Sequence, residues 1–153
     1  MSLRRLQARI PKSELIDKCV LNGYALAFHK DSEKDGSGKC NIVVHEESIV
    51  YGALFEILEC DLLVLDAYEG PGYDRKLIEV DLFSGGKILA HVYIANTIDP
   101  NIKPYTWYKH HVLAGAKELG LPLSYIEYIE SFSAMPDSDT ARSITELSIY
   151  EIS

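Results

Sequence analysis

Five segments with strand character lie before residue 96, whereas the chain after Pro104 reads mainly as helices. The β-branched and aromatic runs that predict strands span residues 19–29, 40–45, 49–57, 75–83 and 87–95. Ser84-Gly85-Gly86, between the last two runs, is typical of a hairpin turn. Hairpins pair strands antiparallel, and a regular alternation of strands with helices is missing. This order predicts an α+β fold with a largely antiparallel sheet that curls into a small barrel.

Helical spacing predicts helices over residues 3–9, 60–70, 105–119, 123–133 and 138–147. In the second of these, Asp61 is expected to cap the start and Gly70 to end the helix. Gly23 predicts a bulge within the first strand. The tail, residues 147–153, fits either a last short strand or a frayed end.

The length and composition predict one globular domain over residues 1–153. The 153 residues are 47% hydrophobic and 25% charged, which suits a chain that buries a core. The formal net charge is −8. Sequence-independent binding to nucleic acid or to an anionic membrane needs a basic surface, so neither partner is expected.

The three cysteines, Cys19, Cys40 and Cys60, are odd in number and lack Cys-x-x-Cys spacing. We therefore expect no disulfide framework and no zinc site, and a reducing cytoplasm is the simplest location. The basic start of the chain lacks the apolar stretch of a signal peptide, and no run of residues is long and apolar enough to span a membrane.

Several partial motifs do not support a metal or phosphate site. Residues 31–36 resemble the start of a calcium loop, but the twelfth position is Ile42, where calcium requires a glutamate. Residues 36–40 depart from the phosphate-loop pattern. His110 and His111 are neighbours on a predicted helix, so their side chains point roughly 100° apart and cannot chelate one ion. We expect structural histidines at surface or partly buried positions, no bound metal and no cofactor.

Glu69 occupies an unusual place at the end of the second predicted helix. The helix dipole disfavours an anion there, and nearby carbonyl groups would raise the pKa of the carboxylate. Tyr68 and Tyr73 flank it, and a Gly-Pro-Gly turn follows. A carboxyl group with a raised pKa suits proton transfer near neutral pH. From these residues alone, a solvated glutamate at a helix end is the commoner outcome, and both interpretations stay open.

Four segments together resemble the gamma-glutamylcyclotransferase family. They are "YGALFEI" (51–57), "LDAYEGPGY" (65–73), "AHVYIAN" (90–96) and "WYKHHVLAGAKELGLPLSYIEYI" (107–129), of which the last is the most distinctive. The resemblance implies a small, mainly antiparallel β-barrel flanked by helices. It also implies a reaction in which the α-amine of a γ-glutamyl group attacks its own γ-carbonyl, which releases an amine and forms 5-oxoproline.

The resemblance also implies roles for four residues. The catalytic glutamate of the family matches Glu69, which would take a proton from the α-ammonium group and return it to the leaving nitrogen. Tyr73, Tyr93 and Tyr108 match substrate-binding positions, although core packing with the hydroxyl at the rim is the slightly favoured alternative for each. The implied partner is a small γ-glutamyl substrate.

One feature of the family has no counterpart in the sequence. Family members begin with a strand that ends in Tyr-Gly-Ser-Asn, whose backbone amides hold the substrate carboxylate, and Met1 aligns just after this loop. Either the true start lies upstream, or the chain is a truncated or diverged relative. In the second case, the missing loop would weaken substrate binding and leave a strand edge that favours a homodimer or is filled by residues 147–153. A catalytically impaired relative that binds a small ligand or a protein is therefore the alternative function.

Overall fold

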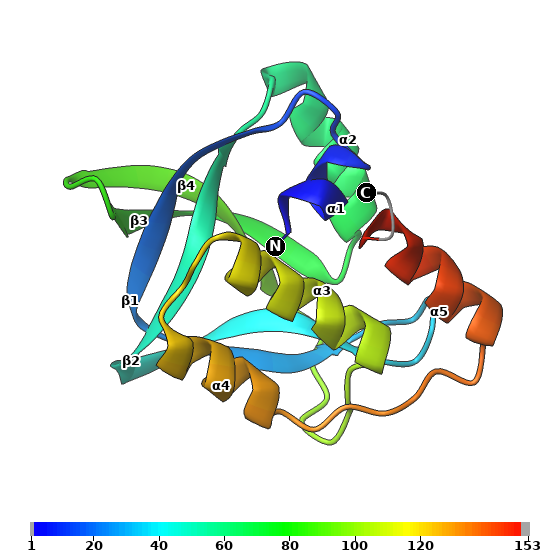
Figure 1. Cartoon of the computed structure of the whole chain (residues 1–153). Helices are drawn as coiled ribbons and strands as arrows, with labels where there is room; N and C mark the ends of the chain where they lie inside the picture. The colour runs from blue at the N-terminus through cyan, green and yellow to red at the C-terminus, as the bar shows by residue number, and fades with distance from the viewer. Residues whose placement is uncertain (1, 151–153) are drawn as a thin grey trace.

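Two long antiparallel strands form the centre of the fold, and helices cover one side of them (Figure 1). The computed structural model describes residues 2–150. In chain order its elements are α1 (Leu3–Gln7), β1 (Glu14–Asp31), β2 (Gly38–Glu56), α2 (Glu59–Glu69), β3 (Tyr73–Leu82), β4 (Lys87–Ala95), α3 (Thr106–Glu118), α4 (Leu123–Ser131), α5 (Thr140–Leu147) and the 3-10 helix η1 (Ser148–Tyr150). The order confirms the predicted α+β class.

The sheet is antiparallel throughout but open, so the predicted barrel is wrong. The strand order is β2-β1-β3-β4, and β2 and β4 form its two edges. β1 and β3 pair only through Cys19 with Leu82 and Val20 with Asp81. A barrel requires continuous pairing around its circumference. Here the β1–β2 hairpin and the β3–β4 hairpin meet over this short stretch and then diverge.

The long hairpin of β1 and β2 is bent at the predicted bulge. The register shifts between Asn22 and Tyr24, and Gly23 has φ 79°, which glycine adopts at little steric cost. Residues 40–45 and 49–57, predicted as two strands, are parts of the single strand β2. The polar residues 45–48 between them remain extended, with His45, Glu46 and Glu47 exposed to solvent opposite the bulge.

The helix ends agree with the sequence only in part. Gly70 ends α2 with φ 78°, as predicted, but Asp61 is not the cap, because the capping position is Leu58 and no side-chain cap bond forms there. The side chain of Asp139 caps α5 by accepting a hydrogen bond from the Arg142 amide at 2.9 Å. The tail, residues 147–153, was expected to be a short strand or a frayed end. Residue 147 ends α5 and residues 148–150 form a 3-10 helix, so this part is not a strand, and residues 151–153 lie outside the described residues.

The main core lies between α3 and α4 and the two long strands. Its buried members are Phe28, Ala116, Leu121, Tyr125, Ile126 and Ile129. On α4, Tyr125 and Ile129 are buried, whereas Tyr128 is 40% exposed. Lys109 of α3 joins the two helices by donating to the carbonyls of Glu130 and Phe132 at 2.6 and 2.5 Å. The positive charge of Lys109 also interacts favourably with the negative end of the α4 dipole.

A buried polar network connects α1 to the C-terminal helices. His111 of α3 is buried, contrary to the expected surface or partly buried position, and lies 3.1 Å from Glu146 and 2.8 Å from the Tyr150 hydroxyl. Arg5 of α1 donates to the same Glu146 carboxylate at 3.1 Å. Ser2 adds a hydrogen bond to Glu118 at 2.9 Å. These bonds hold α1 against α3, α5 and η1, next to the cavity described below.

We expect this network to make the stability of the protein depend on pH. Burial lowers the pKa of His111, although the hydrogen bond with Glu146 acts in the opposite direction. The folded state therefore favours the neutral ring. The stability that this ring contributes is fully present above the unfolded pKa of about 6.5, and it is lost as the pH falls from there through the lower folded pKa. His111→Gln should flatten the decrease in melting temperature between pH 7.5 and 5.5. His110→Gln, which changes the exposed neighbour, should not.

Glu146 should contribute a second loss of stability at lower pH. The hydrogen bond from His111 is the largest cause of the lowered pKa of Glu146. Because this pKa lies below its usual value, the contribution of Glu146 to stability is present above the unfolded pKa and is lost as the pH falls through the folded pKa.

For the His111 prediction, an equal slope of melting temperature against pH in wild type and His111→Gln between pH 7.5 and 5.5 would contradict the assignment to His111.

No helix among residues 2–150 is both long enough and apolar enough to cross a membrane.

Candidate functional site

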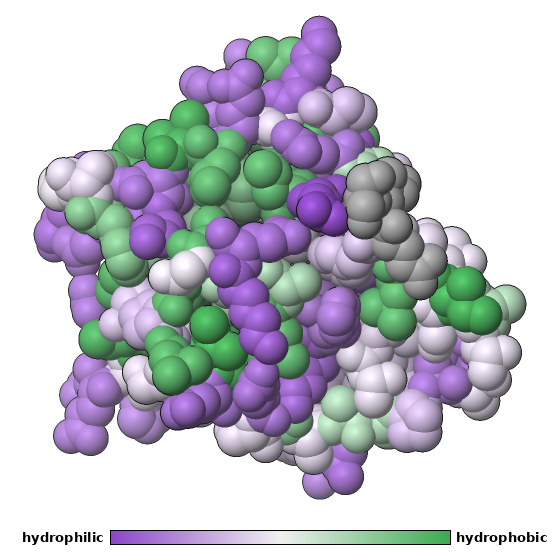
Figure 2. Space-filling model, viewed as in Figure 1, coloured by the Kyte–Doolittle hydropathy of each residue, from purple (hydrophilic) through white to green (hydrophobic). Residues whose placement is uncertain are grey.

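A large cavity opens beneath α1, between the sheet and α2 and α3. Its volume is about 1440 Å³, and α1, all four strands, α2, α3 and α5 contribute side chains to its wall. On the face shown in Figure 2, hydrophobic residues gather beside the position of α1. The wall contains all four residues that the sequence singled out, Glu69, Tyr73, Tyr93 and Tyr108. Segments far apart in the chain thus bring these residues to one site.

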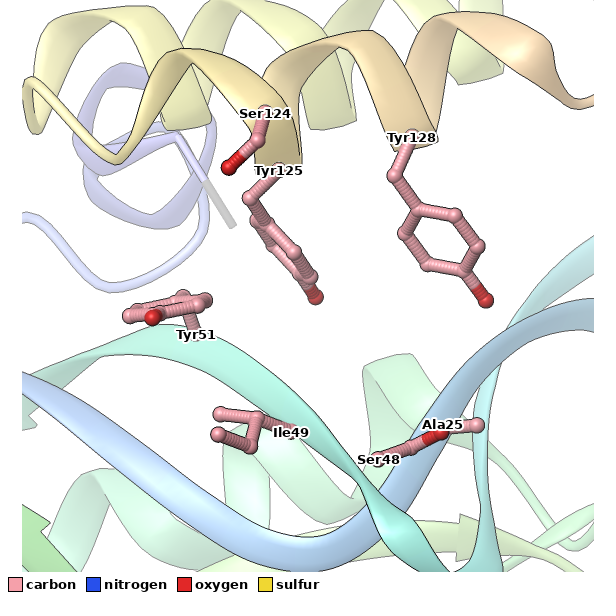
Figure 3. A pocket seen from close by; sticks show the side chains of 7 residues that line it. All are labelled: Ala25, Ser48, Ile49, Tyr51, Ser124, Tyr125 and Tyr128. Carbon is pink, nitrogen blue, oxygen red and sulfur yellow. The ribbon is translucent and has the colours of Figure 1, made fainter.

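A second pocket, between α4 and the long strands, is too small to compete as the main site. Its volume is about 230 Å³, and ligand pockets usually span about 300–1,000 Å³. Tyr125 and Tyr128 extend from α4 toward the strands, where Tyr51 and Ile49 face them (Figure 3). Tyr128 donates to the Leu26 carbonyl at 3.2 Å. These contacts join α4 to the sheet, so we assign the pocket a structural role.

Glu69 is the last residue of α2, and its carboxylate lies in the cavity wall. The side chain is only 15% exposed, so it is not the solvated glutamate that was the alternative. The turn that follows relies on Gly70, whose φ of 78° and ψ of 179° would strain any other residue. The pKa of Glu69 is raised, as predicted, but the largest cause is burial of the carboxylate rather than the helix carbonyls.

A cation lies directly beside this carboxylate. The Nη1 atom of Arg9 is 3.4 Å from Oε1 of Glu69, and its guanidinium carbon lies 5.3 Å from the centre of the Tyr68 ring. Arg9 follows α1 in the chain, so the N-terminal segment supplies the charge that faces the end of α2. Arg9 is the first of the cations that oppose the burial effect on the pKa of Glu69.

Tyr73 and Tyr108 both bind the backbone of Cys40. The Tyr73 hydroxyl donates to the Cys40 carbonyl at 2.6 Å, and the Tyr108 hydroxyl accepts from the Cys40 amide at 3.0 Å. Burial raises the pKa of both tyrosines, so both stay protonated. The two side chains therefore join β3 and α3 to the edge strand β2. They line the cavity as well, and a contact with substrate stays a prediction for each.

Tyr93 lies in β4 and points toward α2 rather than toward Cys40. Its hydroxyl donates to the Asp66 carboxylate at 2.6 Å, and Arg75 binds the same carboxylate at 3.0 Å. Burial is the largest cause of the raised pKa of Tyr93. Asp66 is three residues before Glu69 on α2, so this bond holds the helix that carries Glu69 against the sheet. A substrate contact of Tyr93 stays a prediction.

Removing the Tyr108 hydroxyl should lower stability measurably. In Tyr108→Phe, the Cys40 amide loses the partner of a partly buried hydrogen bond, which costs about 1 kcal/mol or more. Urea denaturation should show this decrease in the free energy of unfolding. Tyr68→Phe, whose side chain is half-exposed, is the matched control and should stay within about 0.5 kcal/mol of wild type. Equal stability of the two variants would contradict the structural role of the Tyr108 bond.

The cations of the cavity wall were missed by the sequence analysis. Arg5 lies 5.4 Å from the Tyr108 ring centre, and Lys39 Nζ lies 4.8 Å from it. Arg5 and Arg9 are four residues apart, a spacing that places two residues on one side of a helical turn. This spacing was the available signal. Its meaning depended on where the N-terminal segment folds, which the spacing alone does not show.

Among residues 2–150, no group of three or more histidine, cysteine, aspartate or glutamate side chains is arranged to hold a metal ion. Burial raises the pKa of Cys40 in the cavity wall to about 11, so its thiol stays protonated at neutral pH. The residues predicted from the sequence contribute one mostly buried carboxylate and three tyrosines to the wall, and Arg9 adds a guanidinium beside the carboxylate.

The comparisons with known proteins define the family. The model of the AIG2-like family matches residues 49–129, which is more than half of the chain. The chain therefore belongs to the AIG2-like family. This segment runs from β2 to α4 and contains all four predicted site residues. No protein with a curated description matches the chain.

The fold resembles that of several solved structures. A structure described as gamma-glutamyl cyclotransferase matches with a TM-score of 0.84 and 22% identity, over 99% of this chain and 93% of that one. Uncharacterized protein loc79017 from Homo sapiens matches with a TM-score of 0.81 and 24% identity, over 92% and 89%. YkqA from Bacillus subtilis matches with a TM-score of 0.68 and 17% identity, over 86% of this chain and 49% of that one. The gamma-glutamylcyclotransferase-like fold is thereby confirmed.

Proposed function

We propose that the protein is a gamma-glutamylcyclotransferase-type enzyme. It would convert a γ-glutamyl amino acid or amine into 5-oxoproline and a free amine, with Glu69 as the general acid and base. The observation that carries the proposal is the mostly buried Glu69 carboxylate in the wall of the large cavity. Family membership and the fold of a structure described as gamma-glutamyl cyclotransferase support the same reaction.

The reaction requires little from the protein besides proton transfer and positioning. Glu69 takes a proton from the α-ammonium group, and the α-nitrogen attacks the γ-carbonyl carbon to close a five-membered ring. The amide bond to the leaving nitrogen then breaks as Glu69 returns the proton to that nitrogen. The ring nitrogen gives up its second proton to the released amine, which leaves as an ammonium ion. Because nucleophile and electrophile belong to one molecule, ring closure already has a high effective molarity. Burial raises the pKa of Glu69 toward the range in which one carboxyl group can both accept and release a proton.

The test is an assay for 5-oxoproline with γ-glutamyl dipeptides and γ-glutamyl amines. We expect 5-oxoproline and free amine in equal amounts. An α-glutamyl dipeptide is the matched control, because its leaving amine is attached to the α-carboxyl carbon and ring closure at the γ-carbon would not release it. Formation of 5-oxoproline no faster than in buffer alone would reject the proposal.

A catalytically impaired relative that binds a small ligand is the second candidate. Two bonds within the site favour it: Arg9 already pairs with the Glu69 carboxylate, and Tyr73 is engaged by the Cys40 backbone. These groups would have to exchange partners during turnover. Saturable binding of a γ-glutamyl compound without any product would favour this second function over the first.

A further inference from the structure

Arg9 and Glu69 place a positive and a negative charge side by side in the cavity wall. Their charged atoms lie 3.4 Å apart, and their side chains are 22% and 15% exposed. Both groups line the cavity and are still reached by solvent, so a ligand in the cavity can contact both. A pair of this kind can bind a molecule that itself carries two opposite charges close together.

The guanidinium of Arg9 retains most of its hydrogen-bonding capacity. Within residues 2–150, Glu69 is its only hydrogen-bond partner. The separation of 3.4 Å is longer than the roughly 2.7–2.9 Å of a strong charge-assisted bond. An arginine has five N–H donors in a planar fork that suits a carboxylate bound through both oxygens. The contact with the Tyr68 ring supports the guanidinium from one side.

The other strongly bonded cations of the wall are already committed to carboxylates. Arg5 binds Glu146 at 3.1 Å. Lys39 donates to Asp35 and to the Ser37 hydroxyl, both at 2.6 Å. Breaking the bonds of Lys39 would leave Asp35, whose side chain is only 8% exposed, without its cation, which is costly. Glu146 is more exposed, but its bond with Arg5 also joins α1 to α5. Among the arginines of the wall, Arg9 has the longest ion pair and can accept a new anion at the smallest loss.

We propose that Arg9 and Glu69 together bind the head group of an α-amino acid, with Arg9 holding the α-carboxylate and Glu69 facing the α-ammonium. The two charged groups of such a ligand are attached to one carbon atom, which matches two adjacent charges in the wall. The ligand would replace the direct Arg9–Glu69 contact with two ion pairs. This inference rests on the proposed function, because that function supplies the γ-glutamyl side chain of the ligand. Binding of the head group itself can be measured without turnover.

The assignment makes Arg9 a specificity residue for the proposed reaction. Glu69 can remove a proton only from an ammonium group that faces it, and a carboxylate fixed by Arg9 orients that group. The resemblance to the family implied backbone amides as the carboxylate donors. In this structure, a side chain from the N-terminal segment offers charged donors at the position next to Glu69.

Lys30 is the closest alternative and therefore the matched control. It lines the same cavity, lies 5.3 Å from the Tyr73 ring centre, and also opposes the burial effect on the pKa of Glu69. It has no direct ion pair with Glu69. Lys30→Gln therefore removes one positive charge from the cavity, as Arg9→Gln does, without removing the group beside the carboxylate.

The test uses two probes that cannot cyclise, L-norleucine and n-pentylamine, which differ only in the α-carboxylate. Binding is measured by ligand-observed NMR or calorimetry on wild type, Arg9→Gln, Arg9→Lys and Lys30→Gln. We expect wild type to bind L-norleucine at least roughly tenfold more tightly than the amine, since a charged hydrogen-bonded pair contributes that much or more. Arg9→Gln should lose this preference, Arg9→Lys should keep part of it, and Lys30→Gln should keep it.

The outcomes separate this inference from the proposed function. Equal preference in Arg9→Gln and wild type, or an equal loss in Lys30→Gln and Arg9→Gln, would overturn the role of Arg9. Failure of wild type to bind L-norleucine would overturn it as well. A preserved preference without any 5-oxoproline would reject the proposed reaction and leave the head-group site in place. Melting curves of each variant show that a lost preference does not come from unfolding.

Discussion

Replacing Glu69 with glutamine should lower turnover of γ-glutamyl substrates by about 10²–10⁴-fold, the usual contribution of a general acid or base. Glutamine keeps the size of the side chain but cannot take a proton from the α-ammonium group. The variant should fold, because it removes a buried charge and the position remains at the end of α2. The rate of 5-oxoproline formation in wild type and Glu69→Gln measures the effect.

Two controls make this experiment specific to the position of the carboxylate. Glu59→Gln changes an exposed carboxylate in the first turn of the same helix and should retain wild-type activity. The pH profile supplies the second control. Glu69 acts as a base only when it is deprotonated, so kcat/KM of wild type should fall as the pH decreases through the pKa of Glu69. Because this pKa is raised, the fall should begin at a higher pH than the pKa of an ordinary glutamate would give. Full activity of Glu69→Gln would exclude the proposed mechanism.

Replacing Trp107 with alanine should cost about 3–5 kcal/mol of stability, the typical loss for a buried aromatic residue. Trp107 is 3% exposed, and its indole nitrogen donates to Asp137 at 2.7 Å. Its ring also packs near Tyr108 and under Lys39. The substitution therefore removes both apolar contacts and a hydrogen bond from the wall of the cavity. Urea denaturation should show a lower midpoint with an unchanged slope.

The matched control for this substitution is Leu123→Ala. Leu123 begins α4 and is 70% exposed, so its removal should change stability by no more than about 0.5 kcal/mol. Trp107→Phe keeps an aromatic ring but loses the bond to Asp137, and it should lie between the other two variants. A free energy of unfolding within about 0.5 kcal/mol of wild type for Trp107→Ala would contradict a structural role for this side chain.

Much of the secondary structure follows from local patterns. The β3–β4 hairpin forms around Ser84-Gly85-Gly86 as predicted, because two consecutive glycines suit the positive φ angles of the turn. Gly23 marks a bulge and Gly70 ends α2 for related reasons. The prediction that Asp61 caps α2 was wrong, because α2 already begins two residues earlier, at Glu59. A polar residue near the start of a helix favours a cap but does not define where the helix begins.

Sheet closure and the cavity depend on contacts between distant segments. The predicted barrel does not form because β1 and β3 pair at only two residue positions, and strand character alone does not specify how far two hairpins stay paired. Strand β2 continues through residues 45–48, which have no partner in β1, because β2 pairs with β1 on both sides of them, at Val44 and Ile49. Local sequence patterns do not contain either constraint.

By itself, the sequence determined the α+β class, the four segments of the family resemblance and the choice of Glu69 as the unusual carboxylate. Only the tertiary structure decided that Glu69 is buried in a cavity wall and that burial, rather than the helix end, is the main cause of its raised pKa. It also decided that Arg9 is its neighbour, although 60 positions separate the two residues in the chain. The physical reason is that burial and charge pairing depend on which distant segments meet, whereas turns and helix ends depend on adjacent residues.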